Sequence, residues 1–456
     1  MFSILFLSLI ILISIYYFFK SYFDLLRFFS FIMPFCVFVK LGNININSTE
    51  FLLFIIILLY PFKNRNFKLP FSYLLFFLFF LFSLVSSIIN DSISEMLILF
   101  FRLFLYLNFL FIFYNCLNNS LKIISIIKSI FYGYIFFSFI LIIEFIYLYI
   151  LSETPSSGAI GWKNLISKFG FYPQTVTEDQ LQGWSSLGSM SGIFTVHHSL
   201  AIYLGSLFFL FLGLNFNSFI CKKYRMYLLA SSFFFLVLTN SRFTLLSLIL
   251  LLVYHYRLIL LRYKFRIFIV LIISIFLFNY NTENRFYSIY YTVGQIINIF
   301  SLNINNLNVV SEYIYQYSNE FASDASSSYR LLYNFNSIRL IFDYPFFGSG
   351  NKGLILTESG KANPHSLYLI FLQRFGLVPF SFLAYFIIIS FNKSKLFVKN
   401  NNSQLGSSPF YVFLFFIIVS FGIFSLSDLR TCFIILFSIV LILKSKILNP
   451  KVESLC

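Results

Sequence analysis

Long apolar stretches separated by short polar turns make up most of this chain. The stretches suited to helices cover residues 2–19, 28–40, 50–62, 69–89, 94–116, 125–151, 199–216, 225–240, 243–261, 267–280, 366–391, 409–427 and 431–443. Most are near the roughly 20 residues that a helix needs to cross a bilayer. The stretches 28–40 and 50–62 are shorter, so each is expected to tilt, to lie buried in the bundle or to stop short of crossing. The pattern predicts an all-α, polytopic integral membrane protein with about 12 transmembrane helices.

Two long polar intervals interrupt the apolar stretches and divide the chain into parts. We expect N-terminal helices at 1–151, a first long loop at 152–198, central helices at 199–280, a large loop with a helix of its own at 281–365, and C-terminal helices with a tail at 366–456. The chain is apolar from its second residue, with no basic residue before the first stretch. That stretch is therefore expected to be a retained span and not a signal peptide.

Composition and charge support a membrane protein and assign its two faces. Hydrophobic residues make up 59% and charged residues 11% of the chain, a balance that soluble domains do not show. The net charge is +16, but Lys and Arg gather in short clusters between apolar stretches, so nucleic acid is not an expected partner. If each apolar stretch crosses the membrane once, these clusters all lie on one face, which the positive-inside rule assigns to the cytoplasm. Both long loops and the Asn240–Arg242 turn then lie on the outer face.

No metal site is predicted. The five cysteines lie in or beside apolar stretches or at the C-terminus, without the spacing of metal ligands. The carboxylates of the outer loops form no clustered pair that would hold a divalent cation. We therefore expect neither a metal nor another cofactor, and a bound diphosphate would have to be held by arginine.

The stretch from Ser326 to Gly376 collects most of the candidate chemistry. The apolar residues Leu331, Phe335, Ile338 and Phe342 recur at helical spacing and predict a short helix that ends before Pro345. Ser327 or Ser328 is the expected N-cap. A Gly348-Ser349-Gly350 turn follows, and Asn363-Pro364-His365-Ser366 then leads directly into an apolar stretch.

Arginines are in excess on the outer face, where basic residues are normally scarce, and this favours an anionic ligand. Arg242 stands in the short turn between two apolar stretches, either snorkelling to the interface or binding a phosphate. Arg330 shares a helix face with Asn334 and Ser337, which is either a solvated face or a ligand-binding one. Arg339 lies about half a turn away and four residues before Asp343, which predicts an ion pair.

Histidines mark the points where the outer loops re-enter the membrane. His365 stands at the end of the large loop, and His197 and His198 stand at the end of the first. An interfacial histidine is often a hydrogen-bonded anchor, but its titration range also suits proton abstraction near neutral pH. His255 lies near the inner face beside Arg257 and is expected to be structural.

Four motifs in this order resemble the O-antigen ligase and O-antigen polymerase (Wzy-type) superfamily of bacterial envelope enzymes. They are GIFTVHHSLA at 192–201, TNSRF at 239–243, the helix from Arg330 into DYPFFGSG at 343–350, and PHSLYLIFLQRFGLVPF at 364–380. The resemblance covers Gly192 to Phe380. This chain departs from the superfamily at Phe243, where a small residue is usual, and at Ser366, where Asn is frequent.

The resemblance implies a GT-C-like membrane fold and glycosyl transfer at the periplasmic face of the bacterial inner membrane. It implies an undecaprenyl-diphosphate-linked oligosaccharide as donor, with a chain-length regulator as a candidate protein partner. The helix between Arg330 and Pro345 in the large loop would lie over the site as a lid. The expected catalytic residues are Arg242, Arg330 and His365. The wider substrate-binding set comprises Arg285, Arg339, His198, Asn334, Gly348 and Gly350.

Three functions remain open from the sequence. We favour a polysaccharide polymerase, because the first outer loop is also long and because the strong Phe, Ile and Asn bias suits a specialised polysaccharide gene cluster. A ligase would use the same chemistry with lipid A core as acceptor. A flippase or transporter for lipid-linked sugars would line a path with polar residues inside the apolar stretches, and these stretches hold few beyond Arg102 and Glu144. A purely structural or binding membrane protein is a fourth, weaker alternative.

Overall fold

The computed structural model describes residues 2–41, 44–63, 68–171, 189–194, 196–214, 222–239, 241–262, 325–352, 354, 356–357, 360–361, 364, 366–399, 405–423 and 428–445. Within these ranges the protein is helical, with two short antiparallel hairpins, β1 (Phe38–Leu41) with β2 (Ile44–Asn47) and β3 (Leu356–Thr357) with β4 (Gly360–Lys361). The first hairpin pairs Phe38 with Asn47 and Leu41 with Ile44.

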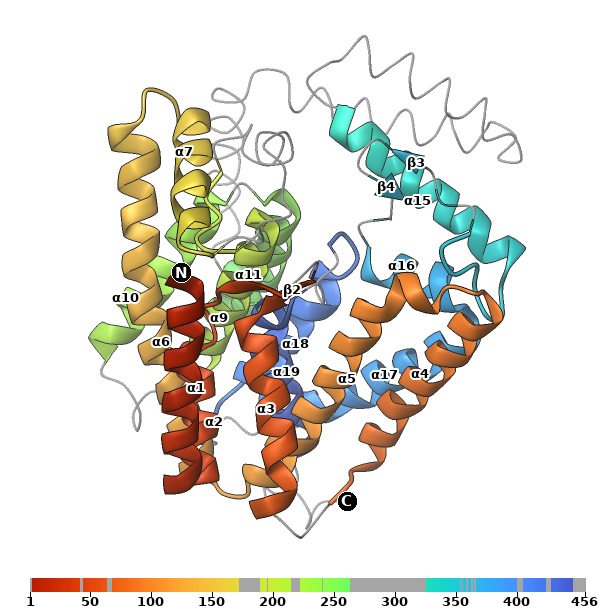
Figure 1. Ribbon diagram of the computed structural model, residues 1–456, viewed down its shortest axis with the longest axis horizontal. Helices are drawn as coiled ribbons and strands as arrows, with labels where there is room; N and C mark the ends of the chain where they lie inside the picture. Colours follow the sequence, from red (N-terminus) through yellow and green to blue (C-terminus); the bar gives the residue numbers. More distant parts are fainter. Residues whose placement is uncertain are drawn as a thin grey trace. The chain divides into compact units, whose positions relative to one another are not determined.

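Most of the helices follow the apolar stretches (Figure 1). The helices are α1 (Phe2–Lys20), α2 (Tyr22–Ile32), α3 (Ser48–Lys63), α4 (Phe71–Ile89), α5 (Ile93–Cys116), α6 (Ser120–Ile146), α7 (Pro155–Lys168), α9 (His197–Gly213), α10 (Lys222–Leu238), α11 (Arg242–Arg262), α15 (Ala325–Asp343), α16 (Leu367–Phe375), α17 (Leu377–Lys399), α18 (Ser408–Val419) and α19 (Leu429–Leu443). A π-helical turn at Tyr147–Leu151 continues α6.

Several of the described helices are suited to cross a membrane. By length and composition, 4 of them qualify, at Phe71–Ile89, Met96–Cys116, Ser120–Leu151 and Leu377–Val398. Shorter apolar helices of 10–17 residues include α9, α18 and α19. The chain is therefore helical and has the character of a membrane protein, whereas the full number of spans and the periplasmic side of the long loops stay predictions. The expected stretch 267–280 lies outside the described residues.

Two apolar stretches do not form the single helices that were expected. In 28–40, α2 ends at Ile32 and Phe38 enters strand β1, because Pro34 lacks the amide hydrogen that a continuing helix needs. In 366–391, Gly376 separates α16 from α17 with φ +82°. A Cβ on Gly376 would lie 2.4 Å from the backbone of Phe346, so only glycine fits at this break.

The chain folds as two compact units. The first comprises Met1–Leu84, Met96–Leu248 and Ser381–Cys456, and the second comprises Val85–Glu95 and Ile249–Phe380. In the first unit, α9 packs against α10, α18 and α19. Every residue of α19 and nearly every residue of α9 is buried, as expected for helices that are apolar all round and lie inside a bundle. In the second unit, α15 packs against α16.

Candidate functional site

Two of the predicted motifs meet in the first unit through a hydrogen bond. His198 stands in the first turn of α9, and its Nδ1 lies 3.0 Å from the Oγ of Ser241. Ser241 also hydrogen-bonds to Thr244, with 2.8 Å between the two hydroxyl oxygens. Ser241 directly precedes Arg242, the first residue of α11. The structure therefore brings a predicted site histidine to the residue beside a predicted site arginine.

The segment Ser189–Phe194, which leads into His197 and His198, is buried and held by a carboxylate. Glu144 of α6 accepts hydrogen bonds from the backbone amides of Ser191 and Gly192, at 2.9 and 2.8 Å. Its side chain is buried. Gly192 has φ +61°, a left-handed conformation that glycine adopts without strain. Both carboxylate oxygens thus fix one short stretch of backbone.

Three further contacts tie the same segment to other helices. The indole Nε1 of Trp162, in α7, donates to the carbonyl of Gly192 at 3.0 Å. The amide of Met190 donates to the carbonyl of Leu238, at the end of α10, at 3.1 Å. Arg430 donates through Nη1 to the carbonyl of Ile193 at 2.9 Å. Helices α6, α7, α10 and α19 therefore each form a hydrogen bond with the segment that leads to His198, and we infer that this segment is rigid.

Lys163 brings a cation close to the Glu144 carboxylate. The lysine lies in α7, next to Trp162, and its side chain is buried. Burial lowers the pKa of Lys163 to about 8, and the nearby charge of Glu144 opposes that shift. The charge of Glu144, which stood out inside an apolar stretch, is thus partly balanced locally.

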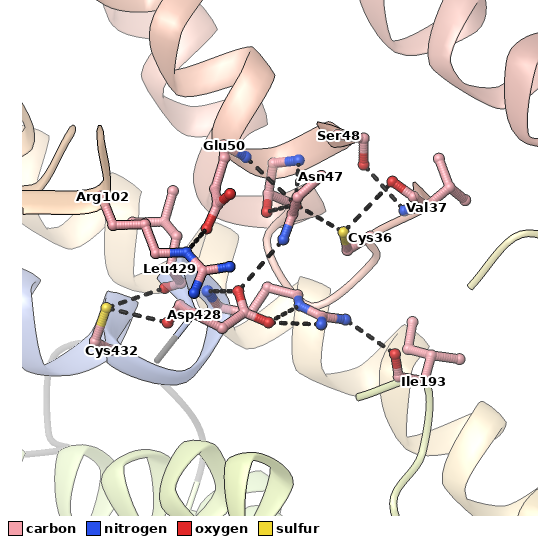
Figure 2. A network of polar contacts seen from close by, with 12 residues as sticks. Cys36, Val37, Asn47, Ser48, Glu50, Arg102, Ile193, Asp428, Leu429 and Cys432 are labelled. Carbon is pink, nitrogen blue, oxygen red and sulfur yellow. Dashed lines mark hydrogen bonds and ion pairs between the residues drawn. The ribbon is translucent and has the colours of Figure 1, made fainter. Parts of the chain in front are cut away.

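Arg430 belongs to a buried ion pair at the start of α19 (Figure 2). Asp428 caps α19 and accepts from the Arg430 amide at 3.0 Å and from its guanidinium Nε at 2.8 Å. The guanidinium also lies 4.6 Å from the centre of the Phe194 ring. Burial acts to raise the pKa of Asp428, but the charge of Arg430, its hydrogen bonds to the carboxylate and the charge of Arg102 together hold the pKa below its usual value. This ion pair links α19 to the Ser189–Phe194 segment.

A second ion pair lies in the same polar network and joins α3 to α5. Glu50 accepts from Arg102 Nε at 2.9 Å, and Figure 2 shows both side chains close to Asp428. With Arg430, the network holds two acidic and two basic groups, so its formal charges cancel. Charges at membrane depth are usually paired in this way. Arg102, which also stood out in the sequence, therefore has a structural partner.

In the second unit, the predicted glycine turn connects α15 to the α16–α17 junction. Gly348 and Gly350 have φ +65° and +61°. The amides of Ser349 and Gly350 donate to the carbonyls of Gln373 and Arg374, at 2.8 and 3.1 Å. Gln373 Nε2 donates in return to Ser349 Oγ and to the Gly350 carbonyl, each at 2.9 Å. Both glycines thus have a structural role within the turn.

The same turn is bonded to the end of α4. Asn90 Nδ2 donates to the carbonyls of Phe347 and Gly348, at 2.9 and 3.1 Å, and Ser86 Oγ also donates to the carbonyl of Phe347. These contacts fix the point at which α15 leads into the turn.

The helix of the large loop, α15, is longer than predicted, and part of its expected solvated face is buried. α15 begins at Ala325, so Ser327 and Ser328 lie inside its first turns and neither is the N-cap. Ala325 and Ser326 are neither Gly nor Pro, so the helix can extend towards the N-terminus beyond Ser327. Ser337 is fully buried and donates to the carbonyl of Tyr333 at 2.9 Å. A solvated face at Ser337 is therefore wrong.

Two other predicted residues of α15, Arg339 and Asn334, have different surroundings. Arg339 and Asp343 form the predicted ion pair, with 3.5 Å between Nε and Oδ2, and both are exposed. Asn334 is half-buried, and its Oδ1 has no hydrogen-bond partner among the described residues.

The three residues expected to be catalytic are Arg242 in α11, Arg330 in α15 and His365. The backbones of Arg242 and Arg330 are described as parts of α11 and α15, but their side chains are not. His365 and Arg285 lie outside the described residues. A meeting of Arg242, Arg330 and His365 stays a prediction. Within the described ranges, no three His, Cys, Asp or Glu side chains gather as a metal site would require.

Sequence reasoning missed the residues that hold the Ser189–Phe194 segment. The available signal was a charged residue inside an apolar stretch for Glu144, and an acidic residue just before such a stretch for Asp428. Both signals mark a buried polar contact, but neither identifies the partner. Nothing in the sequence indicates the roles of Trp162 or Gln373.

We expect Glu144→Gln to destabilise the protein by about 1–3 kcal/mol, because one buried backbone amide loses its acceptor. A glutamine side chain has a single acceptor oxygen, and its NH₂ group would face the second amide. Thermal unfolding of the purified protein in detergent measures the loss. Glu153→Gln makes the same chemical change at an exposed position and should shift stability by less than about 0.5 kcal/mol. Equal unfolding temperatures for the two variants would contradict this role of Glu144.

One comparison with known proteins agrees with the motifs. The model of a protein family described as O-antigen ligase matches residues 227–384, about a third of the 456 residues. The match includes α11, α15, the glycine turn and α16, and it leaves the motif at 192–201 outside. A comparison with curated proteins found no match. The resemblance predicted from the ordered motifs is confirmed over the matched residues.

Proposed function

From the match of residues 227–384 to the O-antigen ligase family, we propose that this protein is a membrane glycosyltransferase that builds a surface polysaccharide. The match implies activity of the ligase or polymerase type, and the helices able to span a membrane supply its setting. Our more specific proposal is a polymerase at the periplasmic face of the inner membrane. It transfers an oligosaccharide chain from undecaprenyl diphosphate onto a lipid-linked repeat unit.

The proposed reaction needs one base and one site for an anion. The acceptor hydroxyl attacks the anomeric carbon of the donor sugar, and the bond from that carbon to the diphosphate oxygen breaks. His365 takes or orients the hydroxyl proton. The lipid diphosphate leaves with a negative charge that Arg242 and Arg330 stabilise by charge-assisted hydrogen bonds. All three residues lie within the matched range, which is the observation that carries the proposal.

The hydrogen bonds around His198 and at the end of α15 support a preorganised site. The buried Ser189–Phe194 segment leads to His198, and His198 is hydrogen-bonded to the residue before Arg242. A group that must be placed within a fraction of an ångström benefits from such support, because misplacement slows the reaction. In the second unit, the glycine turn fixes the end of α15, whose first turns carry Arg330.

A ligase is the second candidate, because the matched family carries that description. The two functions share their chemistry and differ in the acceptor. A transporter is less well supported, since Arg102 has an ion-pair partner and Glu144 has two backbone hydrogen bonds. Their presence inside apolar stretches therefore does not require a transport path.

Deleting the gene and separating the lipopolysaccharide by gel electrophoresis tests these alternatives. A polymerase predicts that the deletion strain carries single repeat units on lipid A and loses the ladder of longer chains. A ligase predicts that long lipid-linked polymer accumulates and lipid A stays bare. Restoration by the wild-type gene is the control. An unchanged ladder in the deletion strain would contradict both enzyme functions.

A further inference from the structure

The described side chains of the apolar stripe of α15 are exposed. Leu331, Phe335, Ile338 and Phe342 share one face of the helix by their spacing. Where the side chains are described, this face is open: Ile338 is 37% and Phe342 is 79% exposed. The stripe that predicted the helix is therefore not its packing face.

The opposite face of α15, which packs inward, is largely polar. Asn336 and Ser337 are buried there together with Leu340, and α15 packs against α16 (Figure 1). A helix in water normally turns its apolar stripe inward and its polar residues outward. α15 instead buries two polar residues and exposes Ile338 and Phe342 beside the Arg339–Asp343 ion pair, which is expected where a helix lies at the boundary between lipid and water.

The turn after α15 is bonded to the ends of two helices able to span a membrane. At the start of the span Leu377–Val398, the amides of Leu377 and Val378 donate to the carbonyls of Pro345 and Phe346, at 2.7 and 3.1 Å. At the end of the span Phe71–Ile89, Asn90 donates to the carbonyl of Phe347. The turn therefore lies at the level where both helices leave the bilayer.

The exposed apolar surface continues from α15 onto these helix ends. Tyr344 and Phe346 of the turn are exposed, as is Leu377 at the start of α17. Ile88 and Ile89, the last residues of α4, are more than half exposed. This continuity indicates that one medium covers the patch and the sides of the spans, and for the spans that medium is lipid.

We propose that Ile338, Phe342, Tyr344 and Phe346 form an interfacial anchor that inserts into the outer leaflet of the bilayer. Aromatic side chains are favoured at this depth, and amphipathic helices lie in the interface with their apolar face buried. The exposed Arg339–Asp343 ion pair is next to the anchor, where the long arginine side chain can reach lipid phosphates. The partner of this surface is the lipid bilayer itself.

The anchor has a consequence that rests on the proposed function. A stripe that extends from Leu331 to Phe342 suits a helix that lies along the membrane surface. Arg330 lies about 18 Å from Phe342 along such a helix, on the same helix face as the buried Ser337. It would then be held at the level of the phosphates, where the diphosphate of a lipid-linked sugar is found.

Tryptophan fluorescence of the full-length protein in phosphatidylethanolamine–phosphatidylglycerol vesicles tests the anchor. Phe342→Trp and Phe346→Trp each place a reporter on the patch, and Lys352→Trp places one at an exposed polar position of the same unit. The wild type, with its native Trp162 and Trp184, supplies the background. Because each change exchanges exposed side chains, thermal unfolding should stay as in the wild type.

We expect brominated phospholipids to quench most of the added emission at positions 342 and 346, and aqueous iodide to leave it nearly unchanged. Position 352 should behave in the opposite way. Quenching of positions 342 and 346 by iodide would show that the patch lies in water and overturn the proposal. Protection from both quenchers would show that protein covers the patch, either another segment or a second copy, and would overturn it as well. The measurement needs no enzymatic activity, so its failure is separate from failure of the proposed function.

Discussion

His365→Ala and Arg330→Ala are each expected to abolish polysaccharide polymer in cells that lack another copy of the gene. Alanine at 365 removes the proposed base for the proton of the acceptor hydroxyl. Alanine at 330 removes one of the two guanidinium groups proposed to stabilise the leaving diphosphate. By analogy with the loss of one oxyanion donor, we expect a rise in the barrier of about 2–4 kcal/mol and a loss of rate on the order of 10²–10³-fold. Gel electrophoresis of the polymer and a rate measurement with lipid-linked substrate give the result.

Loss of polymer supports a chemical role only if the protein still reaches the membrane. Lys352→Ala and His255→Ala are the matched controls, since the first removes an exposed cation in the second unit and the second removes a histidine expected near the inner face. Both should give normal polymer, and all variants should be present in the membrane at similar amounts. A normal polymer ladder from both His365→Ala and Arg330→Ala would rule out the catalytic assignment.

The sequence predicted best those elements whose signal is local. α4 and α5 begin and end within two residues of the predicted stretches, because a long apolar run has few alternatives in a membrane protein. The ion pair of Arg339 with Asp343 follows from their spacing on one helix. The glycine turn after Pro345 follows from the glycines themselves.

Features that depend on distant parts of the chain were beyond sequence reasoning. Gly376 divides one apolar run because the backbone of Phe346 approaches it closely, and the local sequence does not show this approach. The α15 stripe was found, but its outward direction depends on what packs against the other face. Likewise, Glu144 and Arg430 bond to backbone groups of a distant segment, and backbone groups carry no sequence signal.

In the candidate site, too, local motifs were predictable from the sequence and contacts between distant residues were not. The motif order predicted the resemblance, and the hydrogen bond between His198 and Ser241 joins two of the motifs. The arrangement of Arg242, Arg330 and His365 depends on side chains and a loop residue that the structure does not describe.

Arg430→Met is expected to cost about 3–5 kcal/mol of stability, because it leaves the buried carboxylate of Asp428 without its partner. The guanidinium is fully buried, and the methionine also removes the donor to the Ile193 carbonyl. Asp428→Asn should be similarly destabilising, since it leaves the arginine charge buried. Thermal unfolding in detergent and the amount of folded protein in the membrane measure both effects.

The exposed ion pair of Arg27 with Asp24 offers a matched control. Its atoms are 3.1 Å apart, but the arginine side chain is 47% exposed, so Arg27→Met should cost no more than about 1 kcal/mol. The double variant Asp428→Leu/Arg430→Met should recover part of the stability lost in either single variant, because no unpaired charge remains buried. It should still make less polymer than the wild type per folded molecule, since the Ser189–Phe194 segment would lack its anchor on α19. If Arg430→Met is as mild as Arg27→Met, the ion pair does not hold this segment, and the support of His198 must come from the contacts with Glu144, Trp162 and Leu238.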